Sequence, residues 1–173
     1  MTIESPFGKL YLALMERIEA EVPQVKYIDQ DFGQLEGYVK RPAVKFPAVF
    51  IDFQNWTFKN LGDLAQEGEG DVVIHLAFAP MSATDSLKTL AYRKEPLVYY
   101  EIEHELFKKL HGWSPGEIFG RLTRINTRSQ NGPALRRRPI SFKLGFEDYG
   151  VDTGITFEPK PEPSISKTIV GND

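Results

Sequence analysis

Two stretches of the chain carry the spacing of apolar residues that is typical of an amphipathic helix. In residues 5–22, large apolar side chains recur every three or four positions, at Phe7, Leu10, Tyr11, Leu14 and Ile18. Ser5 is suited to cap this helix and Pro6 to occupy its first turn. Residues 97–111 repeat the spacing at Tyr99, Ile102, Leu106 and Leu110, and Gly112 is suited to end that segment. The pattern therefore predicts two helices that each pack one face on a core.

Four other segments favour β-strands. Residues 46–59 are rich in β-branched and aromatic types, and residues 71–79 place Val72, Ile74, Leu76 and Phe78 on one face. Residues 121–128 are β-prone without a clean apolar face, which is typical of an edge strand. Residues 139–147 alternate strictly, with Ile140, Phe142, Leu144 and Phe146 on one side. The acidic, glycine-containing residues 62–71 are interpreted as a solvated hairpin loop.

This order of elements predicts an α+β fold with a mostly antiparallel sheet and two main helices on one face. The expected domain covers residues 1–150, with a core of Leu10, Leu14, Ile18, Ile74, Ile102, Leu106, Phe142 and Leu144. Residues 151–173 alternate proline with charged residues and lose the apolar periodicity, so they predict an extended C-terminal arm. Its spaced apolar residues are candidate anchors on a neighbouring molecule: Ile155, Phe157, Ile165 and Ile169. A disordered terminus is the alternative.

The composition of the chain excludes several classes of protein. The chain has 173 residues, of which 41% are hydrophobic and 26% charged, as expected of one globular domain. No run of 18 apolar residues and no signal-peptide pattern is present, so we expect no membrane association. The absence of cysteine excludes disulfides and thiolate chemistry. A net charge of −3 argues against a general nucleic-acid coat.

Candidate catalytic and metal-binding residues are few. His104 and His111 are seven residues apart, about 10 Å along a helix axis, which is too far to share one metal ion. His75 lies among apolar residues of a predicted strand, where a core histidine is the simpler interpretation. Gly68 and Gly70 lack the rest of a dinucleotide-binding fingerprint. We therefore expect no enzyme activity and no cofactor, although an uncharacterised enzyme stays an open alternative.

One segment has an unusual charge. Residues 121–143 contain seven basic residues and no acidic one: Arg121, Arg124, Arg128, Arg136, Arg137, Arg138 and Lys143. Residues 129–133 form a turn cluster, so Arg136 to Arg138 are expected at the root of an exposed loop. The candidate contacts with an acidic protein partner, or with passing DNA backbone, are Arg124, Arg128, Arg136, Arg137 and Arg138. A solvated surface is the alternative interpretation.

Several segments in this order resemble one family. LYLALMERI lies in the first predicted helix, FPAVFIDF and GDVVIHLAF are strands, and YYEIEHELFKKLHGW is the second helix with its Gly-Trp turn. The last two segments are IFGRLTRINTRS and RPISFKLGFEDYG. Over residues 5–150 this order of segments resembles the tail terminator (tail completion) proteins of long-tailed phages and prophages. The basic turn at 129–138 and the proline-containing arm are not matched to the family.

The resemblance implies a structural role without a cofactor. Proteins of this family form a ring, usually hexameric, on the head-proximal end of the tail. Their implied partners are copies of themselves, the tail tube protein and a head-completion or neck protein, with non-specific contact to passing DNA. The implied location is the virion tail, with host cytoplasm during assembly.

Three alternatives stay open: a head–tail neck connector, a tail tube subunit, and an uncharacterised binding domain unrelated to phages. A tube subunit is expected to be richer in strands, and the two predicted helices count against it.

Overall fold

The computed structural model describes residues 2–35, 44–62, 64–79, 85–131 and 135–149. The helices are α1 (Pro6–Glu21), α2 (Leu90–Lys94) and α3 (Val98–Leu110), with a 3₁₀ turn at Glu95–Leu97 that joins the last two. The strands are β1 (Tyr27–Gln30), β2 (Ala48–Gly62), β3 (Ala65–Phe78), β4 (Thr123–Thr127), β5 (Gln130–Asn131) and β6 (Arg136–Asp148). The predicted arm at 151–173 and its four anchors lie outside the described residues.

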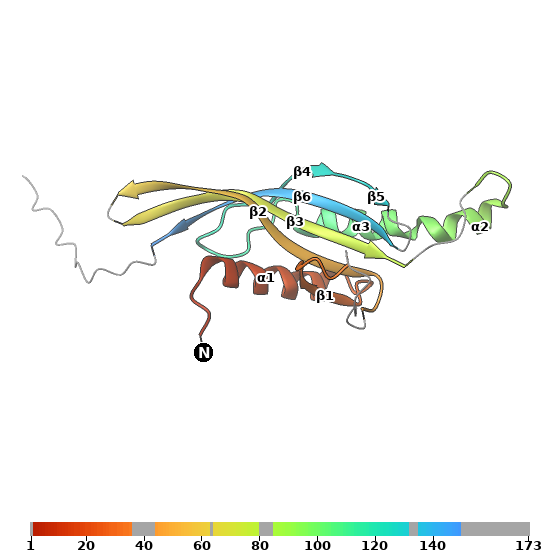
Figure 1. Cartoon of the computed structure of the whole chain (residues 1–173), viewed down its shortest axis with the longest axis horizontal. Helices are drawn as coiled ribbons and strands as arrows, with labels where there is room; N and C mark the ends of the chain where they lie inside the picture. Colours follow the sequence, from red (N-terminus) through yellow and green to blue (C-terminus); the bar gives the residue numbers. More distant parts are fainter. Residues whose placement is uncertain (1, 36–43, 63, 80–84, 132–134, 150–173) are drawn as a thin grey trace, which may run out of the picture.

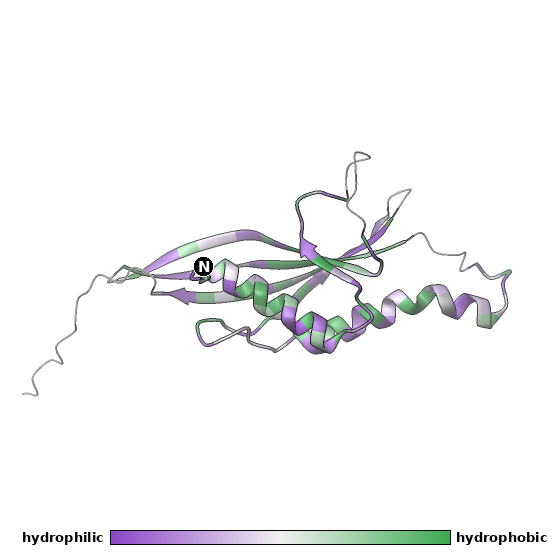
Figure 2. Ribbon diagram, turned by 90° about the horizontal axis from the view of Figure 1, so that it is seen from below, coloured by the Kyte–Doolittle hydropathy of each residue, from purple (hydrophilic) through white to green (hydrophobic). Residues whose placement is uncertain are grey.

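The strands form one sheet in the order β1-β2-β3-β6-β4, with β5 pairing with the first residues of β6 (Figure 1). Among the described strands, β1 and β2 pair in parallel, while β2–β3, β3–β6, β4–β6 and β5–β6 are antiparallel. Helices α1 and α3 lie on the same side of the sheet (Figure 2). This arrangement confirms the predicted α+β fold with a mostly antiparallel sheet and two main helices on one face.

The main core lies between this sheet face and the two helices. Leu10, Leu14 and Ile18 of α1 and Leu106 and Leu110 of α3 are completely buried. They pack with the alternating apolar residues of the central strands, including Ile74, Leu76, Ile140, Phe142 and Leu144. All eight predicted core residues belong to this cluster. The sequence pattern therefore predicted the core correctly because both helical and strand periodicities select the residues that face it.

The opposite face is covered at one end only. A smaller cluster there joins Leu35, Ala48, Phe50, Ala77 and Leu135. Strand β3 is consequently buried on both faces over this half of its length.

The ends of the helices follow the sequence closely. Pro6 stands at the start of α1 and Ser5 occupies the N-cap position, as predicted, but the Ser5 side chain makes no capping hydrogen bond. Its carbonyl instead accepts a hydrogen bond from the backbone of Lys9 at 3.0 Å. Gly112 follows α3 with φ of +79°, a conformation that glycine adopts without strain. The prediction that Gly112 ends the helix is confirmed.

The β2–β3 hairpin is much longer than predicted, and the assignment of 62–71 to a solvated loop is wrong. Strand β3 already begins at Ala65, and its pairing with β2 continues to Gly62. The glycines that suggested a loop lie inside β3, where they leave space for aromatic side chains. A Cβ atom added to Gly70 would lie 2.4 Å from the ring of Trp56. Glycine is therefore required there because an aromatic side chain lies directly on the strand.

A bulge in β2 brings several rings onto the helix-facing side of this hairpin. The register shifts between Gln54 and Thr57, and Asn55 takes φ of 55°. Because one extra residue reverses the alternation, Phe53 and Trp56 both face the core side. They join an aromatic cluster with Phe7, Phe58, Phe119 and Phe146. The core thus extends from α1 along the hairpin.

The molecule is elongated, with a different element projecting at each end (Figure 1). The tip of the β2–β3 hairpin extends beyond α1 at one end. At the other end, α2 continues the line of α3 past the edge of the sheet, and Figure 2 shows the same projection from below. Neither element is enclosed by the main core.

Candidate interaction surfaces

The basic residues predicted at the root of a loop are the first residues of a strand. Arg136, Arg137 and Arg138 begin β6, shortly after the predicted turn in the sequence, and they pair with Phe78, Ala77 and Leu76 of β3. Their side chains are half-buried in the sheet rather than fully exposed. Because side chains alternate along a strand, Arg136 and Arg138 face α3 while Arg137 faces the other side. The three positive charges are separated by the pleat of the sheet rather than clustered in solvent.

Arg138 forms an ion pair with Glu103 of α3. Its Nε donates to Glu103 Oε2 at 2.6 Å and its Nη2 donates to Oε1 at 3.1 Å. The Arg138 and Glu103 side chains keep only 14% and 12% of their surface exposed. Nη1 also donates to Ser129 Oγ. The hydrogen bonds to Glu103 hold the pKa of Arg138 above its usual value. This two-point contact ties α3 to the sheet.

Arg136 contributes to the same attachment. Its guanidinium lies 4.3 Å from the centre of the Tyr99 ring, and that of Arg138 lies 5.3 Å from the Tyr100 ring. Burial raises the pKa of Tyr99 to about 12, with a further contribution from its hydrogen bond with Tyr100. Tyr99 therefore stays protonated and neutral beside the two arginines. This cluster is a structural junction between α3 and β6.

Arg124 and the two helical histidines surround Phe107. The Arg124 guanidinium lies 3.8 Å from the centre of the Phe107 ring, and the backbone N–H of Arg124 donates to His111 Nδ1 at 3.1 Å. The ring of His111 stacks on Phe107 with centroids 5.1 Å apart, and His104 lies on Phe107 at 6.2 Å. Both histidines thus have a packing role on the surface of α3.

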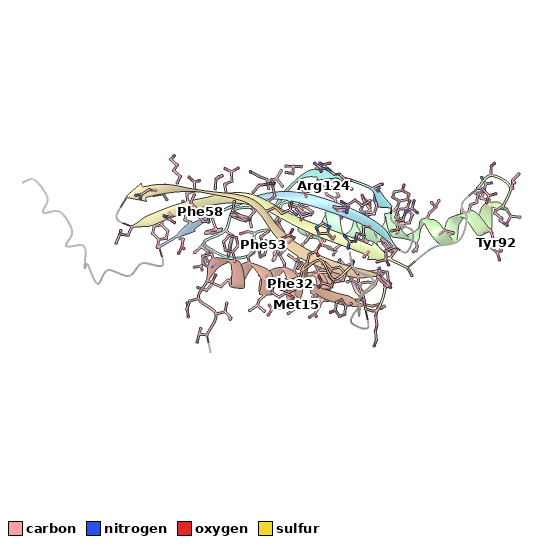
Figure 3. The ribbon with its side chains drawn as sticks, viewed as in Figure 1. Met15, Phe32, Phe53, Phe58, Tyr92 and Arg124 are labelled. Atoms are coloured by element: carbon pink, nitrogen blue, oxygen red, sulfur yellow. The ribbon has the colours of Figure 1, made fainter. Side chains whose placement is uncertain are left out.

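Strand β4 carries the basic side chains that remain exposed. Arg121, Arg124 and Arg128 are exposed on or beside this edge strand, together with Ile125. Figure 3 shows Arg124 at the outer side of β4. The structure therefore divides the predicted basic surface into two parts. Arg136 and Arg138 act within the fold, whereas Arg124 and Arg128 are placed where a partner can reach them.

His75 lies on the sheet face opposite the helices, and it is buried as the sequence suggested. Its Nε2 is 3.5 Å from Oδ2 of Asp31. Among the described residues, no group of three or more histidine or carboxylate side chains is placed to hold a metal ion. No helix in the described part of the chain has the length and apolar character needed to cross a membrane.

The two projecting ends expose large apolar side chains that sequence analysis did not single out. At the α2 end these are Leu87, Leu90, Tyr92, Leu97 and Val98, and at the hairpin tip they are Phe58, Leu61 and Leu64. Tyr92 and Phe58 are labelled at opposite ends of the molecule in Figure 3. Exposed apolar surface of this kind is typical of an interface. The sequence pattern does not reveal this exposed apolar surface, because an apolar residue in or near a predicted helix or strand is equally consistent with burial in the core.

A groove also lies near the hairpin end. It has a volume of about 420 Å³ and is lined by the apolar Ile118, Phe119 and Phe146 and by three carboxylate residues, Glu67, Glu117 and Glu147. Among the described residues that line it, none is basic. The surface beside the hairpin is consequently acidic.

Comparison with known proteins gives a likeness of fold. No family model and no curated protein matches the sequence. Among solved structures, the chain is similar to one described as "Virion of native gene transfer agent (GTA) particle". The identity is 14% and the TM-score is 0.51, and the match covers 84% of this chain and 100% of that chain. The two chains therefore share an overall fold at a low level of sequence identity.

Proposed function

We propose that this protein is a structural component of a phage-type virion, and more specifically a tail terminator. In this role a ring of copies, most often six, caps the head-proximal end of the tail tube and joins it to the head-completion or neck protein. The observation that carries the proposal is the shared fold with a chain from a gene transfer agent virion, which covers the whole of that chain. The resemblance in element order over residues 5–150 supports the terminator role within that class.

The internal contacts support a structural role rather than catalysis. His104 and His111 pack on the ring of Phe107 at the surface, and Arg136 and Arg138 attach α3 to β6 through an aromatic ring and an ion pair. The exposed features are apolar projections and a basic edge strand, which suit protein–protein contacts. In the proposed ring, Arg124 of β4 and Arg128 directly after β4 would face an acidic partner or the DNA that passes through the lumen.

Deletion of the gene from the genome that encodes it tests the proposed role. Loss of a terminator is expected to leave filled heads and separate tails, with tube lengths that are no longer uniform. Loss of a neck connector would instead leave heads that fail to retain DNA, and loss of a tube subunit would leave no tubes at all. Electron microscopy of the particles distinguishes these outcomes, and unchanged particles would refute a virion role.

Localisation within the particle provides a second test. Gold-labelled antibody against the protein should mark the junction between head and tail in intact virions. Negative-stain images of the purified protein, with or without tail tubes, should show rings. Labelling at another position would exclude the terminator role while retaining the broader virion assignment.

The C-terminal segment 151–173 stays a predicted docking arm. If the arm contributes to assembly, truncation after Gly150 should leave the circular dichroism spectrum and melting temperature of the domain unchanged while weakening ring formation. Wild-type attachment of the truncated protein to tails would show that residues 151–173 are dispensable.

A further inference from the structure

The outer edge of β2 has no described strand beside it over most of its length. Strand β1 pairs with β2 from Ala48 to Ile51, and the backbone N–H of Asp31 donates to the carbonyl of Ile51 at 2.9 Å. Beyond Ile51, β2 continues to Gly62 with β3 on its inner side, and within the described part of the chain no backbone group bonds to its outer side. We call residues 57–61, which follow the bulge, the open edge. Unpaired backbone groups of this kind form a template for a further strand.

The opposite edge of the sheet is already covered where β4 begins. The backbone N–H of Gly112 donates to the carbonyl of Leu122 at 2.8 Å, and the N–H of Leu122 donates to the carbonyl of Trp113 at 2.9 Å. The next free donor on this side, the N–H of Arg124, is bound by Nδ1 of His111. The segment after α3 therefore blocks this edge, and the open edge of β2 is the better place for an added strand.

An apolar side chain marks the open edge. Phe58 pairs with Gly68, and Gly68 pairs with Phe146, so the three residues form one row across the sheet. The ring of Phe58 packs on that of Phe146 with centroids 6.3 Å apart, yet 52% of Phe58 stays exposed. Figure 3 shows Phe58 on the projecting hairpin. An apolar residue in the next position of this row, on a strand beside β2, would cover Phe58.

The first part of the predicted C-terminal arm has the sequence of such a strand. The proline-containing pattern begins only at Pro159, and residues 151–158 before it alternate in character. One side carries β-branched and aromatic residues, namely Val151, Thr153, Ile155 and Phe157. The other side carries Asp152, Gly154, Thr156 and Glu158. A period of two with one apolar side is typical of a strand that covers an apolar row, and Pro159 is suited to end it.

A strand that begins at Val151 cannot reach the open edge of its own copy. Asp148 pairs with Gln66 of β3, and Gln66 pairs with Asn60 of β2, so both strands lie between the end of β6 and the open edge. Neighbouring strands are about 4.8 Å apart, which places a strand beside Asn60 about 14 Å from Asp148. The three Cα–Cα steps from Asp148 to Val151 span at most about 11 Å. The open edge of another copy has no such restriction.

We infer that residues 151–158 of one copy add as a β-strand to the open edge of a second copy of this chain. The added strand places Ile155 or Phe157 beside Phe58 and supplies backbone partners to residues 57–61. Because the contact joins different surfaces of the two copies, its repetition closes a ring, and reciprocal exchange closes a dimer. The inference rests on the proposed function only for the ring that the exchanged arms would hold together.

Cysteine cross-linking tests the position and the face of the added strand. The chain has no cysteine, so Phe58→Cys can be mixed with a second variant that carries one thiol in the arm. Oxidation should join Phe58→Cys to Ile155→Cys or Phe157→Cys in higher yield than to Thr156→Cys, because Thr156 lies on the other side of the strand. Ile125→Cys, an exposed apolar position on β4, is the control for random collisions and should give no product with the arm variants. Equal yields at residues 155, 156 and 157, or no product, would overturn the inference.

The double variant Phe58→Cys/Ile155→Cys tests which copy receives the arm. Exchange between copies should give disulfide-linked dimers or larger species on a non-reducing gel. A disulfide that forms only within single chains would show that the arm turns back on its own β2, and it would overturn docking on a second copy.

Sedimentation velocity measures the contribution of the strand to association, at concentrations on the order of 0.1 mM. Ile155→Pro removes a backbone donor from the added strand and should weaken self-association about tenfold. Ile169→Pro is the matched control, because it makes the same change in the arm beyond residues 151–158, and it should associate as wild type does. A monomeric wild type, or equal association of the two proline variants, would contradict the inference.

The outcomes separate this inference from the proposed function. Arm exchange in solution together with normal particles from the deletion strain would refute the virion role and keep the contact. Unjoined tails from the deletion strain, together with wild-type rescue by Ile155→Pro, would keep the virion role and refute the contact. Cross-linking of Phe58→Cys in particles to a different virion protein, but not to the arm, would assign the open edge to that protein instead.

Discussion

Replacing Arg138 by methionine removes the guanidinium but keeps the apolar stem that crosses the strand. The variant leaves the Glu103 carboxylate of α3 facing β6 with only 12% of its side chain exposed and without its cationic partner. Removing one member of a buried ion pair typically costs 3–5 kcal/mol. Because both side chains keep some exposure to water, we expect the lower end of that range, a loss of about 3 kcal/mol in the free energy of unfolding.

Urea denaturation followed by tryptophan fluorescence measures this loss. With an m-value of about 2 kcal/mol/M, the midpoint should fall by about 1.5 M. Arg128→Met is the matched control, because Arg128 is an exposed arginine near the same strand, and it should change stability by less than about 0.5 kcal/mol. Combining Arg138→Met with Glu103→Leu removes both charges and should return stability to within about 1 kcal/mol of wild type. Equal midpoints for Arg138→Met and Arg128→Met would refute the reasoning.

Three further predictions follow from the packing. Leu106→Ala should lower the free energy of unfolding by about 2–5 kcal/mol, because Leu106 is fully buried between α3 and the sheet. A calorimetric melting temperature equal to that of wild type would contradict the described core. Gly70→Ala should destabilise the hairpin by about 1–3 kcal/mol, since its Cβ would lie 2.4 Å from the ring of Trp56. Gly116→Ala, whose Cβ would have ordinary contacts, is its control in the same urea titration and should be tolerated. Absorbance titration should show that Tyr99→Phe removes one phenol that ionises near pH 12. The pKa of Tyr99 is higher in the folded protein than in the unfolded chain. Its contribution to stability is therefore complete below pH 10 and is lost as pH rises towards 12.

The local pattern of the sequence determined the main elements and the core of this protein. Leu10, Leu14 and Ile18 predicted one buried helical face, and Phe142 and Leu144 predicted one buried strand face, because a fixed side-chain period selects which residues share a side. The positive φ of Gly112 was equally predictable, since few other residues end a helix in that conformation.

The position of the basic residues was decided only by tertiary structure. Arg136 and Arg138 follow a turn signal, and nothing in the local sequence shows that β3 extends far enough to pair with them. Their partners, Tyr99 and Glu103, are more than thirty residues away on α3. A charged run becomes a structural junction only when a distant helix supplies an anion and an aromatic ring, which sequence spacing does not encode.

The extent of the hairpin and the exposure of the two ends also depended on the whole fold. Gly68 and Gly70 resemble turn residues in sequence, but Trp56 and Phe146 cover them in the folded sheet. Leu61 and Leu90 have the same apolar character as core residues, and they are exposed because their elements project past the layer that buries the others. Periodicity specifies which side of an element is apolar, whereas the lengths and crossing of the packed layers determine how much of that side is covered.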